Sequence, residues 1–179
     1  MGTKPALISV IIPARNEEEF LPATLEALKA QTYRNFETIV VANGCKDRTA
    51  EVAREYGCRV FELGERGLGP ARNLGAREAS GQILIFLDAD TLLDRDALRT
   101  IAINFRRKHA CGTLRGVPDT NRFAHKAIYA LKNFVHASRL HCGSSGVILC
   151  WKDSFMEAGG FDEGLYLREN SHLMKRLCR

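Results

Sequence analysis

The sequence lacks any long hydrophobic run. Its most apolar stretches, residues 7–12 and 83–87, are far shorter than the roughly 20 residues that a helix needs to cross a bilayer. The chain also reaches Pro13 without the apolar core and small-residue cleavage site of a secretory signal. We therefore expect no membrane-spanning segment and a cytoplasmic protein.

Paired cysteines are missing as well. The six cysteines include no C-x-x-C pair and no matching histidine spacing, which argues against both a zinc site and a disulfide framework. We expect reduced, mostly buried thiols.

A dinucleotide-binding fingerprint is also absent where it would be expected. The turn at residues 67–70 lacks G-x-G-x-x-G spacing and follows no long predicted strand, so it fails the test for a dinucleotide site. The loop after the first strand, residues 13–17, contains no glycine. Sugar-phosphate nucleotidyltransferases usually have a glycine-rich, basic loop there. That class of enzyme therefore stays an alternative function, but this loop disfavours it.

The composition is that of one soluble globular domain. The 179 residues are 45% hydrophobic and 26% charged, which suffices for one core and argues against disorder. Charge is uneven: residues 1–98 hold 12 basic and 15 acidic side chains, and residues 99–179 hold 14 and 6. The second half therefore favours an anionic partner.

Strands and helices alternate along the first half. Apolar runs predict strands at residues 7–12, 36–41 and 82–87. Helices are predicted at 17–31 with Asn16 as N-cap, at 48–56 behind Asp47, and at 70–79. This order predicts an α/β fold with a mostly parallel central sheet, helices on both faces, and ligands at the carboxyl ends of the strands.

The second half continues with a helix at about residues 95–108 and strands at 113–117 and 147–149. A further helix, residues 121–140, has one apolar face and one basic face without an acidic residue. It either packs on the core as a surface helix or contacts an anionic membrane. Trp151 is expected in the core, with stacking on a sugar ring as the alternative.

The local sequence with the clearest chemistry is Asp88-Ala89-Asp90, directly after a buried strand. Two carboxylates so close together are costly unless a cation neutralises them. Their hard oxygen ligands suit Mg²⁺ or Mn²⁺, which bridge carboxylates to diphosphate oxygens. Asp94 and Asp96 are better candidates for capping the next helix.

Three loops follow these strands or open a helix. Residues 13–17, 42–49 and 67–73 offer backbone donors and polar side chains to a nucleotide. Capping of the following helices is the plainer interpretation for the first of them.

The order of these segments resembles the family 2 inverting glycosyltransferases with the GT-A fold. The resemblance covers residues 8–177 and rests on Pro-Ala-Arg-Asn-Glu at 13–17, the loop at 44–49, Gly-Pro-Ala-Arg-Asn-Leu-Gly at 69–75, Leu-Asp-Ala-Asp at 87–90, and Gly-Gly-Phe-Asp-Glu at 159–163. It implies one Rossmann-like domain, 1–179, with a nucleotide-binding half at about 1–98 and a basic acceptor-side half at about 99–179.

The resemblance also implies roles for individual residues. It implies a metal, Mn²⁺ or Mg²⁺, at Asp90 and Asp88, with Asp90 also contributing to catalysis. The nucleotide sugar would contact a further set of residues: Pro13, Ala14, Arg15, Glu17, Asn43, Asp47, Arg72, Asp88 and Ala89.

Two positions depart from the family pattern. Ala42-Asn43-Gly44-Cys45 stands where Asp-Asp-Gly-Ser is usual, and alanine cannot accept a hydrogen bond from a uracil. Glu169-Asn170 stands where an acidic pair usually supplies the catalytic base. We expect Glu169 to be the base, with Asp162, Glu163 or a non-catalytic domain as alternatives.

The expected function is metal-assisted transfer, with inversion, of a sugar from a nucleoside diphosphate to a hydroxyl or polyprenyl-phosphate-type acceptor. The basic second half suits a phosphorylated acceptor at the inner face of a membrane. Family members commonly continue with further helices, so the alternative is a truncated or non-catalytic donor-binding domain that needs a partner. The basic residues are not interleaved with exposed aromatic residues, which argues against nucleic acid. No sequence feature predicts an oligomeric state.

Overall fold

The structure is a computed structural model that describes residues 5–64, 67–114, 147–165 and 169–178. The predicted basic helix at 121–140 lies outside the described residues, as does most of the strand predicted at 113–117.

Within the described residues, a six-stranded sheet has the order β3-β2-β1-β4-β6-β5. The first four strands in chain order pair in parallel, whereas β6 is antiparallel to both β4 and β5. The predicted mixed, mostly parallel sheet is confirmed. The strands are β1 (Ile8–Ala14), β2 (Phe36–Asn43), β3 (Arg59–Leu63), β4 (Ile83–Phe86), β5 (Cys111–Thr113) and β6 (Ile148–Trp151).

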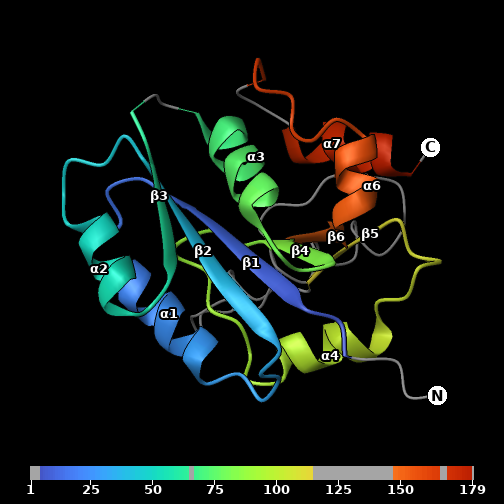
Figure 1. Ribbon diagram of the computed structural model, residues 1–179, viewed down its shortest axis with the longest axis horizontal. Helices are drawn as coiled ribbons and strands as arrows, with labels where there is room; N and C mark the ends of the chain where they lie inside the picture. Colours follow the sequence, from blue (N-terminus) through green and yellow to red (C-terminus); the bar gives the residue numbers. More distant parts are fainter. Residues whose placement is uncertain (1–4, 65–66, 115–146, 166–168, 179) are drawn as a thin grey trace, which may run out of the picture.

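Helices cover both faces of this sheet (Figure 1). One core packs α1 (Leu21–Lys29), α2 (Thr49–Glu55) and α4 (Ala97–Asn104) against alternate residues of β1 such as Val10. The other core packs α3 (Leu68–Glu78), α6 (Lys152–Glu157) and α7 (Glu169–Leu177) against the opposite face, where Ile11 points. Side chains of β1 alternate between the two faces of the sheet, so this strand contributes to both cores.

Strand β3 was not predicted. In its sequence, Arg-Val-Phe-Glu-Leu, Arg59 and Glu62 are exposed. An edge strand pairs on one side only and therefore needs no continuous apolar run. Its parallel pairing with β2, from Ile39 opposite Arg59 to Asn43 opposite Leu63, brings the end of β3 beside the predicted nucleotide loops.

The start of α1 differs from the prediction. Residues 17–20 form a turn, and the helix begins at Leu21 instead of Glu17. Asn16 is not an N-cap: its φ is 55°, and its side-chain oxygen accepts a hydrogen bond from the backbone N–H of Lys46 at 2.8 Å. Asn16 therefore links the loop after β1 to the loop after β2.

The caps of two later helices were predicted with mixed success. Asp47 accepts a hydrogen bond at 3.1 Å from the backbone N–H of Thr49, the first residue of α2. Asp96 is the N-cap residue of α4 but makes no side-chain cap bond. Its carboxylate instead accepts a hydrogen bond from the hydroxyl of Thr32 at 2.5 Å.

Trp151 belongs to the core, as expected. It is 8% exposed, with the ring of Phe105 stacked 5.3 Å away and the guanidinium of Arg107 4.1 Å from its centroid. Both neighbours occupy the surroundings of the indole, so the alternative of stacking on a sugar was wrong.

The described cysteines are less buried than predicted. Cys150 is buried, whereas Cys45, Cys58 and Cys111 are half-buried and Cys178 is exposed. The sulfurs of Cys111 and Cys178 lie 3.7 Å apart. Burial, partly opposed by Lys29, raises the pKa of Cys58 to about 11.

Among the described helices, none combines the length and apolar character needed to cross a membrane.

Candidate active site

A cavity of about 470 Å³ opens at the carboxyl ends of β1, β2 and β4, between the first turns of α3 and α7. It gathers residues that are up to 157 positions apart in the sequence. Its lining is Pro13, Ala14, Arg15, Glu17, Asn43, Leu68, Arg72, Asp88, Ala89, Asp90, Glu169 and Asn170. Every residue predicted for the site except Asp47 lines this one cavity.

Asp88 and Asp90 reach the cavity because β4 ends at Phe86 and the chain then turns. The N–H of Thr91 donates to the carbonyl of Asp88 at 3.1 Å. The hydroxyl of Thr24 on α1 donates to the carbonyl of Ala89 at 2.7 Å. These two bonds fix the backbone that carries both carboxylates.

Neighbouring negative charges disfavour the charged forms of two carboxylates in this cavity, Glu17 and Asp88. Burial and then the charge of Asp90, followed by those of Asp47 and Asp88, raise the pKa of Glu17. Burial also raises the pKa of Asp88 despite the adjacent Arg72, and Asp90 adds to the increase. A cation placed among these groups would relieve the repulsion.

Arg72 holds the acidic groups of two distant segments together. Its guanidinium lies 3.1 Å from Asp88 and 3.4 Å from Glu169, and it donates to the side-chain oxygen of Asn170 at 2.9 Å. The arginine side chain is only 3% exposed. Phe161 lies beneath it, with the guanidinium carbon 5.1 Å from the ring centroid.

Glu169 begins α7 and is the most buried carboxylate of the cavity, with its side chain 11% exposed. One carboxylate oxygen faces Arg72, and the other has no hydrogen-bond partner among the described residues. Burial raises the pKa of Glu169, Arg72 opposes the increase, and Asp88 adds to it. That unpartnered oxygen is itself buried, and the carboxylate has a raised proton affinity.

Asn43 has a structural contact that the sequence did not reveal. Its amide donates to the carbonyl of Gly67 at 3.0 Å and accepts from the N–H of Gly67 at 3.3 Å. This paired contact ties the start of α3 to the end of β2. Ala42 is 3% exposed within β2 and does not line the cavity.

Asp47 lies outside the cavity lining. Its carboxylate accepts hydrogen bonds from the hydroxyl and N–H of Thr49 and from the N–H of Glu18. Burial raises the pKa of Asp47, but these hydrogen bonds outweigh it and leave a net lowering. Asp47 thus joins the loops after β1 and β2.

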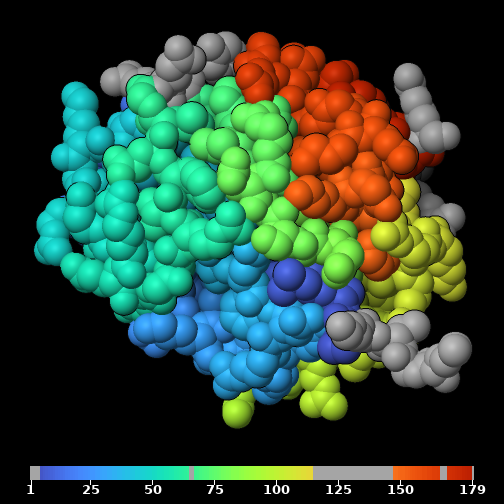
Figure 2. All heavy atoms as spheres, viewed as in Figure 1, coloured from blue at the N-terminus to red at the C-terminus, as the bar shows by residue number. Residues whose placement is uncertain are grey.

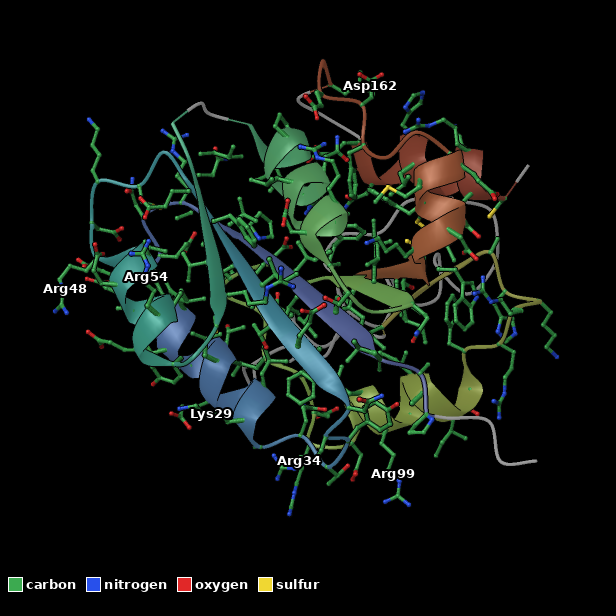
Figure 3. All side chains as sticks on the ribbon, viewed as in Figure 1. Lys29, Arg34, Arg48, Arg54, Arg99 and Asp162 are labelled. Atoms are coloured by element: carbon green, nitrogen blue, oxygen red, sulfur yellow. The ribbon has the colours of Figure 1, made fainter. Side chains whose placement is uncertain are left out.

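The two alternative bases are placed elsewhere. Asp162 lies at the outer edge of the molecule (Figure 3), where its carboxylate accepts from the N–H of Gly164 at 3.0 Å. Glu163 accepts from the amide of Asn73 at 2.8 Å. Neither lines the cavity.

Two lining residues were not predicted as ligand contacts. Leu68 is 40% exposed at the first position of α3, and its place between two glycines was the signal available in the sequence. Asn170 had been noted only as a departure from an acidic pair, yet it bonds to Arg72.

Comparison with known protein families identifies the family of this chain. The chain matches the model of Glycosyl transferase family 2 over residues 9–157. The chain belongs to glycosyl transferase family 2. This assignment disfavours the nucleotidyltransferase alternative.

Relatives of known name are glycosyltransferases. The chain is 43% identical over 121 residues to 4,4'-diaponeurosporenoate glycosyltransferase of Staphylococcus haemolyticus, covering 63% of this chain and 32% of that protein. It is 41% identical over 91 residues to glycosyltransferase AglE of Haloferax volcanii, covering 46% and 30%. The chain thus spans about a third of the length of these relatives.

Solved structures share the fold. Mannosyltransferase PcManGT of Pyrobaculum calidifontis, in complex with GDP-Man and Mn²⁺, superposes with a TM-score of 0.78 at 20% identity, covering 95% of this chain and 51% of that one. S. aureus TarS 1-349 in complex with UDP-GlcNAc gives 0.73 at 22% identity, covering 95% and 52%. These similarities confirm the predicted GT-A fold.

Proposed function

We propose that this chain carries the donor site and catalytic base of a family 2 glycosyltransferase. The enzyme would transfer a sugar, with inversion, from a nucleoside diphosphate to a hydroxyl or polyprenyl-phosphate-type acceptor. The observation that carries the proposal is the single cavity in which Arg72 joins Asp88 to Glu169. The family assignment and the nucleotide sugars bound by PcManGT and TarS support it.

The residues of the cavity fit a divalent cation that binds together with the donor. Among the described residues, no cluster of three or more ligand-type side chains is placed to hold a metal alone. Asp88 and Asp90 therefore offer at most a carboxylate pair, and Mg²⁺ or Mn²⁺ commonly takes its other ligands from water and diphosphate oxygens. Such an ion would stabilise the charge on the departing diphosphate.

Glu169 is the proposed general base. Its carboxylate, which lines the cavity, would accept the proton of the acceptor hydroxyl while the hydroxyl oxygen attacks the anomeric carbon and the nucleoside diphosphate leaves. One displacement of this kind inverts the anomeric centre. The raised pKa of Glu169 makes the carboxylate a better proton acceptor than an ordinary glutamate. Asn170 would orient Arg72 instead of acting as a second acid.

The donor and metal are tested together by thermal stabilisation. UDP-GlcNAc, GDP-Man and the free diphosphates are compared with Mn²⁺, with Mg²⁺ and with chelator. We expect a metal-dependent shift that Asp90→Ala abolishes. Asp94→Ala is the matched control, because Asp94 is an exposed aspartate on the same connection and does not line the cavity. An equal shift in chelator, or in Asp90→Ala, would remove the metal from the proposal.

The base is tested by Glu169→Gln, which keeps the shape of the side chain. We expect turnover to fall about 100-fold or more, with donor affinity nearly unchanged because the diphosphate ligands remain. Nucleoside diphosphate release measures turnover. Equal turnover in the variant would eliminate Glu169 as the base. Donor binding without turnover in the unmodified chain would instead favour the alternative of a domain that needs further residues.

A further inference from the structure

The turn after α6, residues 158–161, has a fixed conformation. Gly159 and Gly160 have φ values of 78° and 68°, a left-handed conformation that side chains rarely adopt. A Cβ on Gly160 would lie 2.7 Å from the side-chain oxygen of Asn73. Backbone conformation and close contact therefore both require glycine at position 160.

Asn73 on α3 uses its whole amide on the segment that contains this turn. Its NH₂ donates to the carbonyl of Phe161 at 2.9 Å and to the carboxylate of Glu163 at 2.8 Å. Its oxygen accepts from the N–H of Phe161 at 2.8 Å. The side chain is nearly buried, with Asn73 7% exposed. Asn73 thus clamps the backbone of Phe161 from both sides.

The clamped phenylalanine supports the arginine of the candidate active site. The ring of Phe161 packs edge-on against Phe86 at 4.9 Å, and Phe86 is the last residue of β4, two positions before Asp88. The Phe161 ring also contacts Arg72, whose guanidinium bonds to Asp88 and Glu169. The turn therefore contacts Arg72 through Phe161, and Arg72 bonds to the proposed base.

A second contact joins the same turn to α7. Arg176, near the end of that helix, donates to the carbonyl of Ala158 at 2.7 Å and also to the carbonyl of Gly160. Glu169 is at the opposite end of α7. Figure 2 shows α3 side by side with the segment that contains α6 and α7. The turn thus connects the helix that carries Arg72 to the helix that carries Glu169.

We propose that the turn at residues 158–161 positions the carboxylate of Glu169, with Asn73 and Arg176 as positioning residues. Asn73 fixes the turn to α3, Arg176 fixes α7 to the turn, and Phe161 supports the guanidinium that bonds to Glu169. Neither Asn73 nor Arg176 lines the cavity. The proposal rests on the role of Glu169 in the proposed function.

This arrangement predicts a loss of turnover instead of donor affinity. Asp88 and Asp90 are also held by the pairing of β4 with β1 and β6 and by the bond from Thr24 to Ala89, and these contacts do not involve the turn. Glu169, by contrast, is held through α7 and through its ion pair with Arg72. A base displaced by about 1 Å can lose about 100-fold in rate, whereas donor contacts on the strand side would be retained.

The test measures turnover and donor affinity separately in Asn73→Ala and Arg176→Met. We expect kcat for release of nucleoside diphosphate from UDP-GlcNAc or GDP-Man to fall about 10- to 100-fold, with donor Kd changed less than about 3-fold. The matched control is Ser9→Ala, which removes a buried hydroxyl that bonds to Gly81 and Glu37 at the amino end of β1. It should lower stability while leaving kcat unchanged.

A second measurement does not depend on activity. Hydrogen exchange across residues 169–177 should be faster in Asn73→Ala and in Arg176→Met than in Ser9→Ala, because Arg176→Met releases α7 from the turn and Asn73→Ala releases the turn from α3. If Asn73→Ala does not fold, Phe161→Leu takes its place, since it keeps an apolar side chain but removes the ring beneath Arg72.

The outcomes separate this proposal from the proposed function. Unchanged exchange in α7, or a kcat loss no larger than that of Ser9→Ala, overturns the positioning role. Faster exchange in α7 together with no turnover in the unmodified chain supports the mechanical link and counts against the proposed function instead.

Discussion

Arg72→Met should destabilise the protein strongly at neutral pH and much less at pH 5. The substitution keeps a long side chain but removes the cation beside Asp88 and Glu169, at 3.1 and 3.4 Å. Glu169 is then a nearly buried carboxylate that has lost its ion-pair partner. Its pKa, already raised by burial against the effect of Arg72, should rise further.

The magnitude follows from the two ways in which the protein can respond. Breaking a buried ion pair by removing one partner costs about 3–5 kcal/mol. Protonation of the carboxylate limits this cost: for an ordinary glutamate pKa of about 4.3, it requires about 4 kcal/mol at pH 7 and about 1 kcal/mol at pH 5. The pair with Asp88, whose side chain is 38% exposed, adds at most about 1 kcal/mol. We expect a loss of about 4–5 kcal/mol at pH 7 and about 2 kcal/mol at pH 5.

Urea unfolding at the two pH values measures this difference. Arg48→Met is the control, because Arg48 pairs with Glu55 on the surface, and its loss should be under about 1 kcal/mol. The double variant Arg72→Met/Glu169→Gln should recover much of the stability at pH 7. An equal loss at pH 7 and pH 5, or a loss under about 1 kcal/mol at pH 7, would refute the reasoning.

Two further predictions concern packing and pH. Gly75→Ala would place a Cβ 2.4 Å from a methyl carbon of Ile11, so we expect a loss of about 1–3 kcal/mol in urea unfolding; a variant as stable as the original contradicts this contact. Glu17, Asp88 and Glu169 have raised pKa values, so the folded state binds protons that the unfolded state has released. Stability should therefore rise as the pH falls from 7 toward 5, and a decrease over this range in urea titrations would be inconsistent with the raised values.

Much of the fold could be predicted because its signals are local. The runs that became β1 and β4 are buried along their whole length, and β2 is buried from Ile39 onward, so their sequences are mainly apolar there. Strand β3 escaped prediction because Arg59 and Glu62 face solvent at the sheet edge. The start of α1 was misplaced because Asn16 bonds to the next loop instead of capping the helix.

The residues of the candidate site also differ in how readily they could be predicted from the sequence. Asp88 and Asp90 could be predicted because two carboxylates after an apolar strand are conspicuous in the sequence itself. Asp47 and Asn43 were harder to interpret, since the loops they hold are brought together only by pairing of neighbouring strands. Both side chains form hydrogen bonds that join neighbouring loops.

By itself, the sequence determined the family, the alternation of strands and helices, and the position of the carboxylate pair, because each depends on residues that are close together in the chain. Only the tertiary structure decided how Arg72 reaches Glu169, 97 residues further along, and how Asn73 clamps Phe161. Contacts of this kind depend on the relative placement of α3, α6 and α7, which is set by packing against one face of the sheet and leaves no periodic pattern in the sequence.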